Sequence, residues 1–591
     1  MTLQDAIKQV CSDLTSRASS PDPIEYDGAF AKRAKEAAAA GDEDLATSLR
    51  LLGNVFSMYF QFGAEGPFGP LAVFPNGRRT FLPEDLSPEQ AGQLEELVDA
   101  CDDPVFVARV ADVLWIRIRK HEYARTAIRA YLESANREID SWVPTRDYLK
   151  RAAQIAMGLG TKAPERRIVK EKIETLFERD RSECFTPDRG YWPAALAEIL
   201  IENRLVANWE RLGDECVAIA KGFPVRPGCD EPRRYYDLAA TCYERARLPA
   251  KAEDAKLAIA RHWEAEAAKF RTPEGGDGFQ IAHRLERAIE AYRKAGGQQA
   301  KVAELMGELR RANELALSQM KPIGVPMDVE PLILEARRAM AGKAGRAAIE
   351  AFARLRAPAP YAAVREDVLR QSKAHPLSAM ISTKVMVPEG NVAATVPGML
   401  EDEEAKLQAM VVQAYAMRHD LAGATLLEEA RSIVVSSEAA MWKAAVRELV
   451  EGSTFVPEDR RSIYERALVA GFEGDKMLFS HLVVPQLENS LRRVFREAGL
   501  QITSMDAQGV QEERDLNQLL RMEGAKDVLG EDLLWETRSL LIEKTGPNLR
   551  NRLCHGLLGD SDFERPAGNT LLWLTVFLLL GAKAALGGPV P

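Results

Sequence analysis

Apolar side chains recur every three to four residues along most of the chain, which is the spacing of one face of an α-helix. The segments with this pattern are rich in Ala, Leu, Glu and Arg, and Pro or Gly lies near many of their ends. In the N-terminal part these segments are 31–40, 88–99, 105–135, 145–157 and 163–179. The pattern therefore predicts an all-α protein.

Two interruptions of the helical pattern predict small β-hairpins or loops. The segment 62–86 is rich in Gly and Pro and contains a Pro-Asn-Gly turn, which indicates a loop or short hairpin between helices. Residues 384–387 and 392–396 flank the turn Pro388–Asn391 and look like the two strands of a β-hairpin. We therefore expect one or two small hairpins in an otherwise helical chain.

Between 193 and about 317 the predicted helices come in pairs. The segments 234–246 and 250–267 place small and aromatic residues at the spacing of tetratricopeptide-like helical hairpins, and 288–295 resembles the first helix of such a pair. The repeat is degenerate, so an irregular all-helical domain is an equal alternative. A helical solenoid of this kind would sense or bind a partner protein or ligand.

The changes of pattern divide the chain into four segments. We expect an N-terminal helical domain (1–180), a tetratricopeptide-like region (181–320), a mostly helical connecting region with a hairpin (321–455) and a C-terminal helical bundle (456–591). In the connecting region, helices are expected at 400–419 and 421–435. The helices expected in the bundle are 457–470, 476–498, 511–522, 531–544, 549–558 and 567–586.

Composition indicates a soluble, multidomain protein of the cytoplasm. A chain of 591 residues is too long for one hydrophobic core, and its hydrophobic fraction of 46% is that of a globular protein. The seven cysteines contain no C-x-x-C pair and indicate reduced thiols, and the N-terminus lacks the pattern of a signal peptide. The net charge of −10 means that a nucleic acid would have to meet a local basic cleft.

The most apolar run, Leu571–Gly581, is too short for a membrane span, which needs about 20 residues. Lys583 interrupts its continuation. We expect a buried core helix whose Trp573, Phe577 and Leu580 face the helix 549–558, and no membrane partner. A C-terminal membrane anchor is the alternative, which would make the protein a tail-anchored adaptor.

The common catalytic signatures are absent from the sequence. There is no phosphate-binding loop, no H-E-x-x-H and no G-x-S-x-G. Six histidines have no neighbour at metal-ligand spacing, so we expect neither a metal site nor a cofactor. These isolated histidines are His121, His262, His283, His375, His419 and His481.

One motif remains, R-N-x-x-x-H-G, which places Arg550, Asn551 and His555 on one predicted helix. A histidine exchanges protons near neutral pH, and an arginine offers a fork of donors to phosphate oxygens. Asn551 and His555 are one turn apart, so Asn551 can orient the imidazole. Asn548 is a good N-cap for this helix. Arg550 and His555 are about 140° apart on an ideal helix, so two copies across a twofold axis would enclose a phosphate better than one.

This motif resembles the signature of the HEPN superfamily (higher eukaryotes and prokaryotes nucleotide-binding domains). The segments 483–493 and 509–520 extend the resemblance to a family within it that includes the ER-membrane-associated RNA degradation protein. The resemblance covers about 470–586 and implies a HEPN-type helical bundle that dimerises and cleaves RNA without metal. It implies Arg550, Asn551 and His555 as catalytic residues, and makes Glu488, Arg492 and Arg552 candidates for lining the site.

The motif is short enough to arise by chance. Arg550 and Arg552 could instead pair with Glu536 or Glu543, and Glu488 and Arg492 could form an ordinary ion pair one turn apart. The preferred hypothesis is a cytoplasmic ribonuclease that resembles toxin-like or antiviral effectors and forms a homodimer through its C-terminal domain. The alternative is a catalytically inactive scaffold that dimerises or binds RNA or nucleotide.

Overall fold

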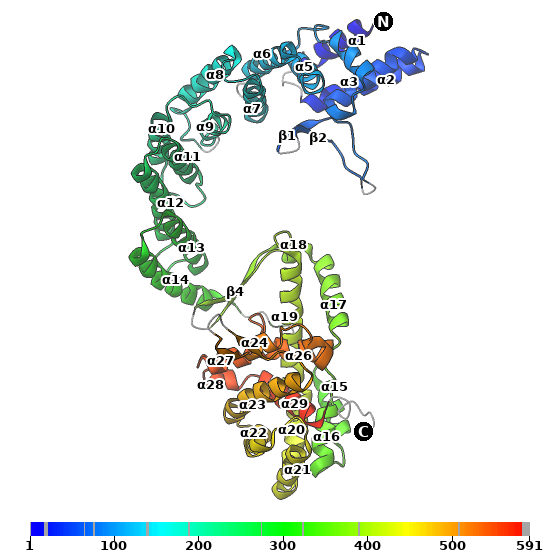
Figure 1. The fold of residues 1–591 in the computed structure, drawn as a ribbon, viewed down its shortest axis with the longest axis vertical. Helices are drawn as coiled ribbons and strands as arrows, with labels where there is room; N and C mark the ends of the chain where they lie inside the picture. The colour runs from blue at the N-terminus through cyan, green and yellow to red at the C-terminus, as the bar shows by residue number, and fades with distance from the viewer. Residues whose placement is uncertain are drawn as a thin grey trace. The chain divides into compact units, whose positions relative to one another are not determined.

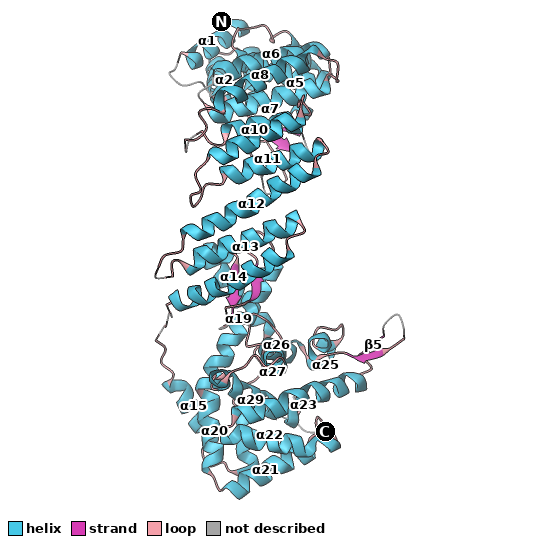
Figure 2. Cartoon of the chain, turned by 90° about the vertical axis from the view of Figure 1, so that its left-hand side faces the viewer, coloured by secondary structure: helices cyan, strands magenta, loops and turns pink. Residues whose placement is uncertain are grey.

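The computed structural model describes residues 2–16, 22–63, 66–74, 77–137, 141–186, 189–273, 275–321, 324, 326–387, 390–505 and 509–581. The chain divides into two compact units, Met1–Ala316 (unit 1) and Leu317–Pro591 (unit 2). Helices dominate both units (Figure 1), and the strands of the described residues form three two-stranded antiparallel hairpins (Figure 2). The predicted all-α class is confirmed, with one more hairpin than expected.

Unit 1 is a succession of helices with one hairpin near its start. The hairpin pairs β1 (Tyr59–Gly63) with β2 (Gly66–Gly69) and begins a few residues before the predicted interruption. A short 3-10 turn, η1 (Pro83–Asp85), follows it. The helices are α1 (Leu3–Thr15), α2 (Pro23–Ala39), α3 (Glu43–Phe56), α4 (Pro88–Glu95), α5 (Pro104–Ile118), α6 (His121–Arg137), α7 (Trp142–Gly158), α8 (Pro164–Asp180), α9 (Trp192–Glu202), α10 (Trp209–Gly222), α11 (Glu231–Arg245), α12 (Pro249–Lys269), α13 (Gly278–Ala295) and α14 (Gln299–Gln319).

Most helices of unit 1 pack against a neighbour in sequence. Helix α2 packs on α3, α5 on α6, α6 on α7, α10 on α11, α11 on α12, and α12 on α13 (Figure 1). The predicted pair 234–246 and 250–267 corresponds to α11 and α12. This packing is repeat-like, because each helix buries its apolar face mainly against adjacent helices.

Unit 2 contains the two other hairpins and the rest of the helices. The hairpin of β3 (Thr383–Met386) and β4 (Val392–Val396) confirms the prediction, although part of its turn lies outside the described residues. The third hairpin joins β5 (Thr503–Met505) to β6 (Gln511–Glu513). The helices are α15 (Glu330–Met340), α16 (Gly345–Arg354), α17 (Tyr361–Ala374), α18 (Pro376–Met380), α19 (Glu403–Ala424), α20 (Leu426–Ser436), α21 (Ala439–Gly452), η2 (Glu458–Arg460), α22 (Arg461–Glu473), α23 (Lys476–Glu497), α24 (Leu516–Leu519), α25 (Ala525–Leu529), α26 (Glu531–Leu541), α27 (Leu549–Cys554), α28 (Asp560–Phe563) and α29 (Ala567–Leu580).

The predicted helix 511–522 is wrong. Gln511–Glu513 is strand β6, and the helix α24 begins only after Asp515, whose side chain accepts a hydrogen bond from the backbone N–H of Gln518 (2.9 Å). Glu512 and Glu513 therefore belong to an exposed strand. Asp515 alone caps a helix, and that helix, α24, is only one turn long.

The apolar C-terminal run forms the central helix of unit 2, as predicted. Helix α29 packs against α16, α19, α20, α22 and α23, and Trp573 on it is fully buried. The indole N–H of Trp573 donates a hydrogen bond to the carbonyl of Ala353 (3.0 Å), so the side chain faces α16 and not the helix that carries Arg550 as expected. Among the described residues, no helix combines the length and apolarity needed to cross a membrane. Lys583 lies outside the described residues.

One hydrophobic cluster contains residues from both of the expected segments 321–455 and 456–591. Buried residues from Ala336 to Leu579 form one cluster, in which α20 and α21 pack with α22, α23 and α29. Val456, where the C-terminal bundle is expected to begin, is itself a member of this cluster.

Unit 2 buries one carboxylate at the junction of several segments. Glu536 on α26 is fully buried and accepts hydrogen bonds from Arg356 (2.5 Å) and from the backbone N–H of Ala359 (3.1 Å), and its Oε1 lies 3.0 Å from Nε2 of His419. Burial opposes the charge, but the hydrogen bond and charge of His419 and the charge of Arg356 lower the pKa of Glu536 to about 2. The carboxylate thereby fastens α26 to α19 and to the connector before α17.

Replacing Glu536 by Gln should destabilise unit 2 strongly at pH 7. The change leaves the buried Arg356 without its carboxylate, which costs about 3 kcal/mol or more. Hydrogen exchange of the protected amides of α19 and α26 should become at least about 100-fold faster. Glu448→Gln, an exposed position on α21, is the matched control and should leave these rates unchanged. Equal hydrogen-exchange rates in Glu536→Gln and Glu448→Gln would contradict the stabilising role of the buried Glu536 carboxylate.

The stabilisation that Glu536 provides should depend on pH. Because the pKa of Glu536 is about 2 in the folded chain and ordinarily near 4.5, its charge stabilises the fold above about pH 4.5. This contribution is lost as the pH falls from 4.5 toward 2. The difference in unfolding free energy between wild type and Glu536→Gln should therefore shrink over that range, as urea denaturation of unit 2 would measure. A constant difference would show that the carboxylate does not remain charged.

Candidate functional site

The helix that carries the motif is shorter than predicted. Helix α27 ends at Cys554, His555 is its C-cap, and Gly556 has a left-handed φ of 65°. The N–H of Gly556 donates to the carbonyl of Leu553 (3.0 Å), and that of Leu557 to the carbonyl of Arg552 (2.8 Å). These two bonds form a Schellman motif, which ends a helix at a glycine. The expected helix 549–558 is therefore wrong by its last four residues.

Arg550 is held by two acidic side chains. Its Nε donates to Oε2 of Glu488 on α23 (3.1 Å), and its Nη1 lies 3.8 Å from Oδ2 of Asp515. Burial opposes the charge of Asp515, but hydrogen bonds from Gln518 and Asn517 and the charge of Arg550 lower its pKa. The partner of Arg550 is thus neither Glu536 nor Glu543, the alternatives expected from the sequence.

Asn551 forms a reciprocal amide pair with Asn517 of α24. Its Nδ2 donates to Oδ1 of Asn517 (3.0 Å), while its Oδ1 accepts from Nδ2 of Asn517 (2.9 Å) and from Nη1 of Arg550 (2.9 Å). A further bond runs from Nδ2 to Oδ1 of Asn548 (2.8 Å). Asn548 has a left-handed φ of 51° and makes no side-chain cap bond, so its expected role as a capping side chain is wrong.

His555 stands apart from this network. Its side chain is exposed, and it makes no hydrogen bond, ion pair or ring contact with any residue that the structure describes. Only its backbone N–H reaches Asn551, by donating to the carbonyl oxygen (3.1 Å). The expectation that Asn551 orients the imidazole is therefore wrong for the single chain, because the Asn551 amide is engaged by Asn517, Asn548 and Arg550.

The three candidate lining residues separate into two groups. Glu488 bonds Arg492 one turn away (2.9 Å) as well as Arg550, so both Glu488 and Arg492 lie beside the motif. Arg492 also approaches Glu513 of β6 (2.6 Å). Arg552 does not contact this group. It donates a hydrogen bond to Asp562 of α28 (3.0 Å) and so connects α27 to α28.

A pocket of about 700 Å³ opens beside Asn551 in unit 2. Segments of β4, α19 and α24 and the connector 542–545 form its walls, so most of its lining is distant in sequence from the motif. Arg521 in the wall pairs with Glu543 (2.8 Å), whereas Lys544 is exposed and forms no ion pair with a described residue. Sequence reasoning missed Asn517, Arg521 and Lys544, because none of them lies in the motif.

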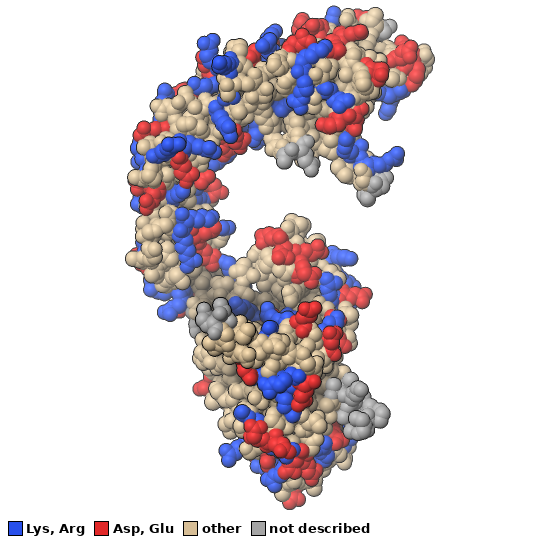
Figure 3. Space-filling model, in the orientation of Figure 1, with Lys and Arg blue, Asp and Glu red and all other residues tan. Residues whose placement is uncertain are grey.

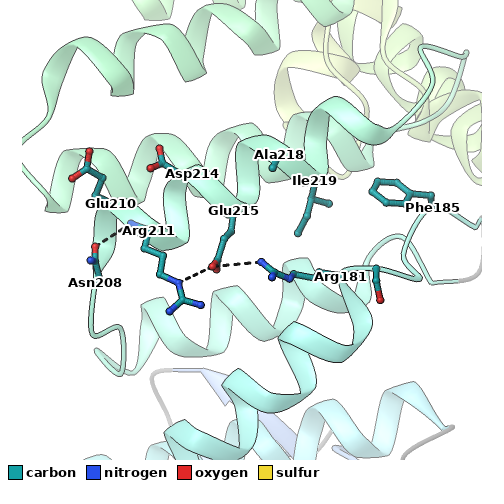
Figure 4. A pocket seen from close by; sticks show the side chains of 10 residues that line it. Arg181, Phe185, Asn208, Glu210, Arg211, Asp214, Glu215, Ala218 and Ile219 are labelled. Carbon is teal, nitrogen blue, oxygen red and sulfur yellow. Dashed lines mark hydrogen bonds and ion pairs between the residues drawn. The ribbon is translucent and has the colours of Figure 1, made fainter.

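A second pocket, of about 610 Å³, lies on the surface of unit 1 beside α10 (Figure 4). Arg211 donates to Glu215 (2.8 Å) and Arg181 approaches the same carboxylate (3.5 Å). Glu178 binds both arginines from outside (2.6 and 3.0 Å). Both arginines are neutralised by carboxylates, and Glu210 and Asp214 also line the pocket, so it offers no excess positive charge to an anion.

Two further features restrict the chemistry. The described residues contain no group of three or more His, Cys, Asp or Glu side chains able to hold a metal ion. In the face seen in Figure 3, basic and acidic side chains are intermixed over both units. On that face a polyanion would therefore be bound by local groups and not by a broad basic surface.

The comparisons with known proteins concern mainly the N-terminal part. Residues 1–168 match the family model described as a domain of unknown function (DUF7380). No curated protein is significantly similar to the chain. Among solved structures, a circular tandem repeat protein with novel repeat topology is 14% identical, with 99% of this chain and 96% of that chain covered. The TM-score of 0.12 is too low to assign the two chains to one fold.

Gly556→Ala should loosen the end of α27. A Cβ there meets no atom within 4 Å, so the cost is that of a left-handed backbone alone, about 1 kcal/mol. Hydrogen exchange in a peptide covering α27 should become about fivefold faster, and Gly556→Asn should have a smaller effect, since Asn tolerates this conformation. Gly559→Ala, at a φ of −97° and with equal space, is the control. Equal effects of the two alanines would contradict the Schellman assignment.

Proposed function

We propose that unit 2 is a metal-independent ribonuclease domain of HEPN type, with Arg550, Asn551 and His555 as its catalytic residues. One observation carries the proposal: the imidazole of His555 is exposed at the C-cap of α27, a helix that also carries Arg550 and Asn551 beside a pocket of about 700 Å³. Unit 1 would then bind a partner or ligand that directs the activity, as in toxin-like or antiviral effectors.

The chemistry requires one base, one acid and a cationic donor. The imidazole of His555 takes the proton of the ribose 2′-hydroxyl, and the 2′-oxygen attacks phosphorus. The bond from phosphorus to the 5′-oxygen breaks, and that oxygen receives a proton from a second imidazole. Arg550 donates to the nonbridging oxygens, which carry the developing charge. The products are a 2′,3′-cyclic phosphate and a 5′-hydroxyl.

The second imidazole would come from a second copy of the chain. Within one chain Arg550 is turned toward Glu488, whereas His555 is exposed and unattached. If two α27 helices face each other across a twofold axis, His555 of the partner subunit would supply the acid. Such an isologous contact is the commonest way for identical chains to associate.

A second candidate function has its own supporting observation. Glu488 binds both Arg492 and Arg550, so the cations of the motif are already neutralised inside the chain. This arrangement favours a structural role, in which unit 2 is an inactive scaffold that dimerises or binds RNA or nucleotide. A ribonuclease requires a phosphate to displace Glu488 from Arg550.

Purified protein should cleave single-stranded or structured RNA in the presence of EDTA. His555→Ala should reduce the rate by a factor of about 100 or more, because general acid–base catalysis contributes about 10²–10⁴. His375→Ala replaces another exposed histidine of unit 2 and should leave the rate unchanged. Activity that requires Mg²⁺, or that survives in His555→Ala, would contradict the proposal.

Glu488→Gln should strengthen RNA binding. The change removes a negative charge shared by two arginines, and we expect the Kd of a short RNA to fall about fivefold in low salt. Glu497→Gln at the exposed end of the same helix is the control. Fluorescence anisotropy measures both. An unchanged Kd in Glu488→Gln would favour the scaffold.

The dimer should be detectable through Cys554. This thiol lies next to His555 and is exposed, whereas the other cysteines are buried or partly buried. A short bismaleimide linker should join two chains at micromolar concentration, and Cys554→Ser should abolish the product. Light scattering that finds only monomers, with and without RNA, would contradict the arrangement.

A further inference from the structure

Unit 1 contains a pocket of about 490 Å³ within residues 22–148. Residues from α2, the segment around β1, α5 and the start of α7 line it, and most of these residues are apolar or aromatic. Tyr59, Phe60 and Tyr148 contribute rings, and Val143 stands at an exposed position of the wall. This volume falls in the range of small-molecule sites, about 300–1,000 Å³.

The pocket has a buried cation in its wall. Arg109 on α5 is 2% exposed, and its guanidinium carbon lies 5.0 Å from the ring centre of Phe60 and 4.5 Å from that of Phe68. Its Nη1 donates to the carbonyl of Met58 (3.1 Å). No carboxylate of the described residues lies within ion-pairing distance of Arg109, and its other nitrogens make no hydrogen bond to them.

The buried acid on the same helix is already paired. Asp112, one turn away on α5, accepts two bonds from Arg151 (2.7 and 2.8 Å) and a third from Tyr131 (2.8 Å). A buried charge without a partner is costly, and burial lowers the pKa of Arg109 accordingly. The contrast between Arg151, which is fully paired, and Arg109, which is not, points to an anion supplied from outside the chain.

The two acidic residues of the pocket do not fill that role. Asp147 pairs with Arg146 (2.7 Å), and burial raises its pKa. Asp22 is exposed and caps α2 by accepting from the N–H of Ile24 (3.1 Å). Arg109 therefore remains the charged donor that a ligand would meet.

We propose that this pocket binds a small organic anion, with its carboxylate, phosphate or sulfonate on Arg109 and an apolar or aromatic body against Phe60, Tyr59 and Tyr148. The forked guanidinium suits an oxyanion, and the rings suit a planar body. The site lies inside the region that matches the DUF7380 model. It is independent of the ribonuclease proposal, because it belongs to unit 1.

The probe is 8-anilinonaphthalene-1-sulfonate, which joins an aromatic body to one anionic group; the uncharged N-phenyl-1-naphthylamine is its control. Fluorescence titration of the full chain should show one saturable sulfonate site. Val143 is 57% exposed, so charged side chains there leave the core intact. Val143→Glu should weaken sulfonate binding about fivefold and Val143→Lys should strengthen it, with no effect on the neutral dye.

Arg109→Met tests the cation itself. If this variant keeps the helical circular dichroism of wild type, its affinity for the sulfonate should fall at least about tenfold while the neutral dye still binds. Equal affinities in Val143→Glu and Val143→Lys would overturn the proposal even if Arg109→Met fails to fold. A folded Arg109→Met variant that loses affinity for both dyes equally would also overturn the proposal, because the pocket would then have no specificity for an anion.

Discussion

The arrangement of unit 2 depends on one buried carboxylate. Glu536 has no access to solvent, so its charge is tolerable only while Arg356, His419 and the N–H of Ala359 surround it. These partners come from α19 and from the connector between α16 and α17, far from α26 in sequence. The guanidinium of Arg356 also lies over the ring of Trp573 on α29, at 4.3 Å. Four segments are thus fixed relative to one another, and α26 leads from this junction to the pocket and to α27.

The same principle of charge compensation separates the candidate sites. The arginines beside α10 and beside Glu488 form ion pairs with carboxylates of their own unit. An anionic ligand at either place must therefore displace an existing partner. At Arg109 the partner is missing among the described residues. The ribonuclease proposal therefore rests on the exposed His555 more than on Arg550, whereas the anion pocket of unit 1 rests on the unpaired charge itself. Neither site draws on a broad basic surface, which agrees with the net charge of −10.

Local pattern predicted the helices well and the site only in part. The apolar period predicted α29 and the pair α11 and α12, and the turn Pro388–Asn391 with its two flanking segments predicted the hairpin of β3 and β4. It could not predict where α27 ends, because Gly556 stops the helix through backbone conformation. It could not pair Asn551 with Asn517, since 34 residues separate them. A signal for the buried carboxylate was present: Glu536 lies within Leu-Leu-Trp-Glu-Thr, an acid amid large apolar residues, which indicates a buried partner.

The central claim is that RNA binds at α27, and hydrogen exchange with an uncleavable RNA tests it most directly. A 2′-O-methylated oligonucleotide lacks the hydroxyl that attacks phosphorus, so it can bind without reacting. We expect it to slow exchange in the segments 394–397, 517–521 and 542–555, which contain the motif and the walls of the pocket beside Asn551. Slowing confined to unit 1, or unchanged exchange in all three segments at saturating RNA, would contradict the account.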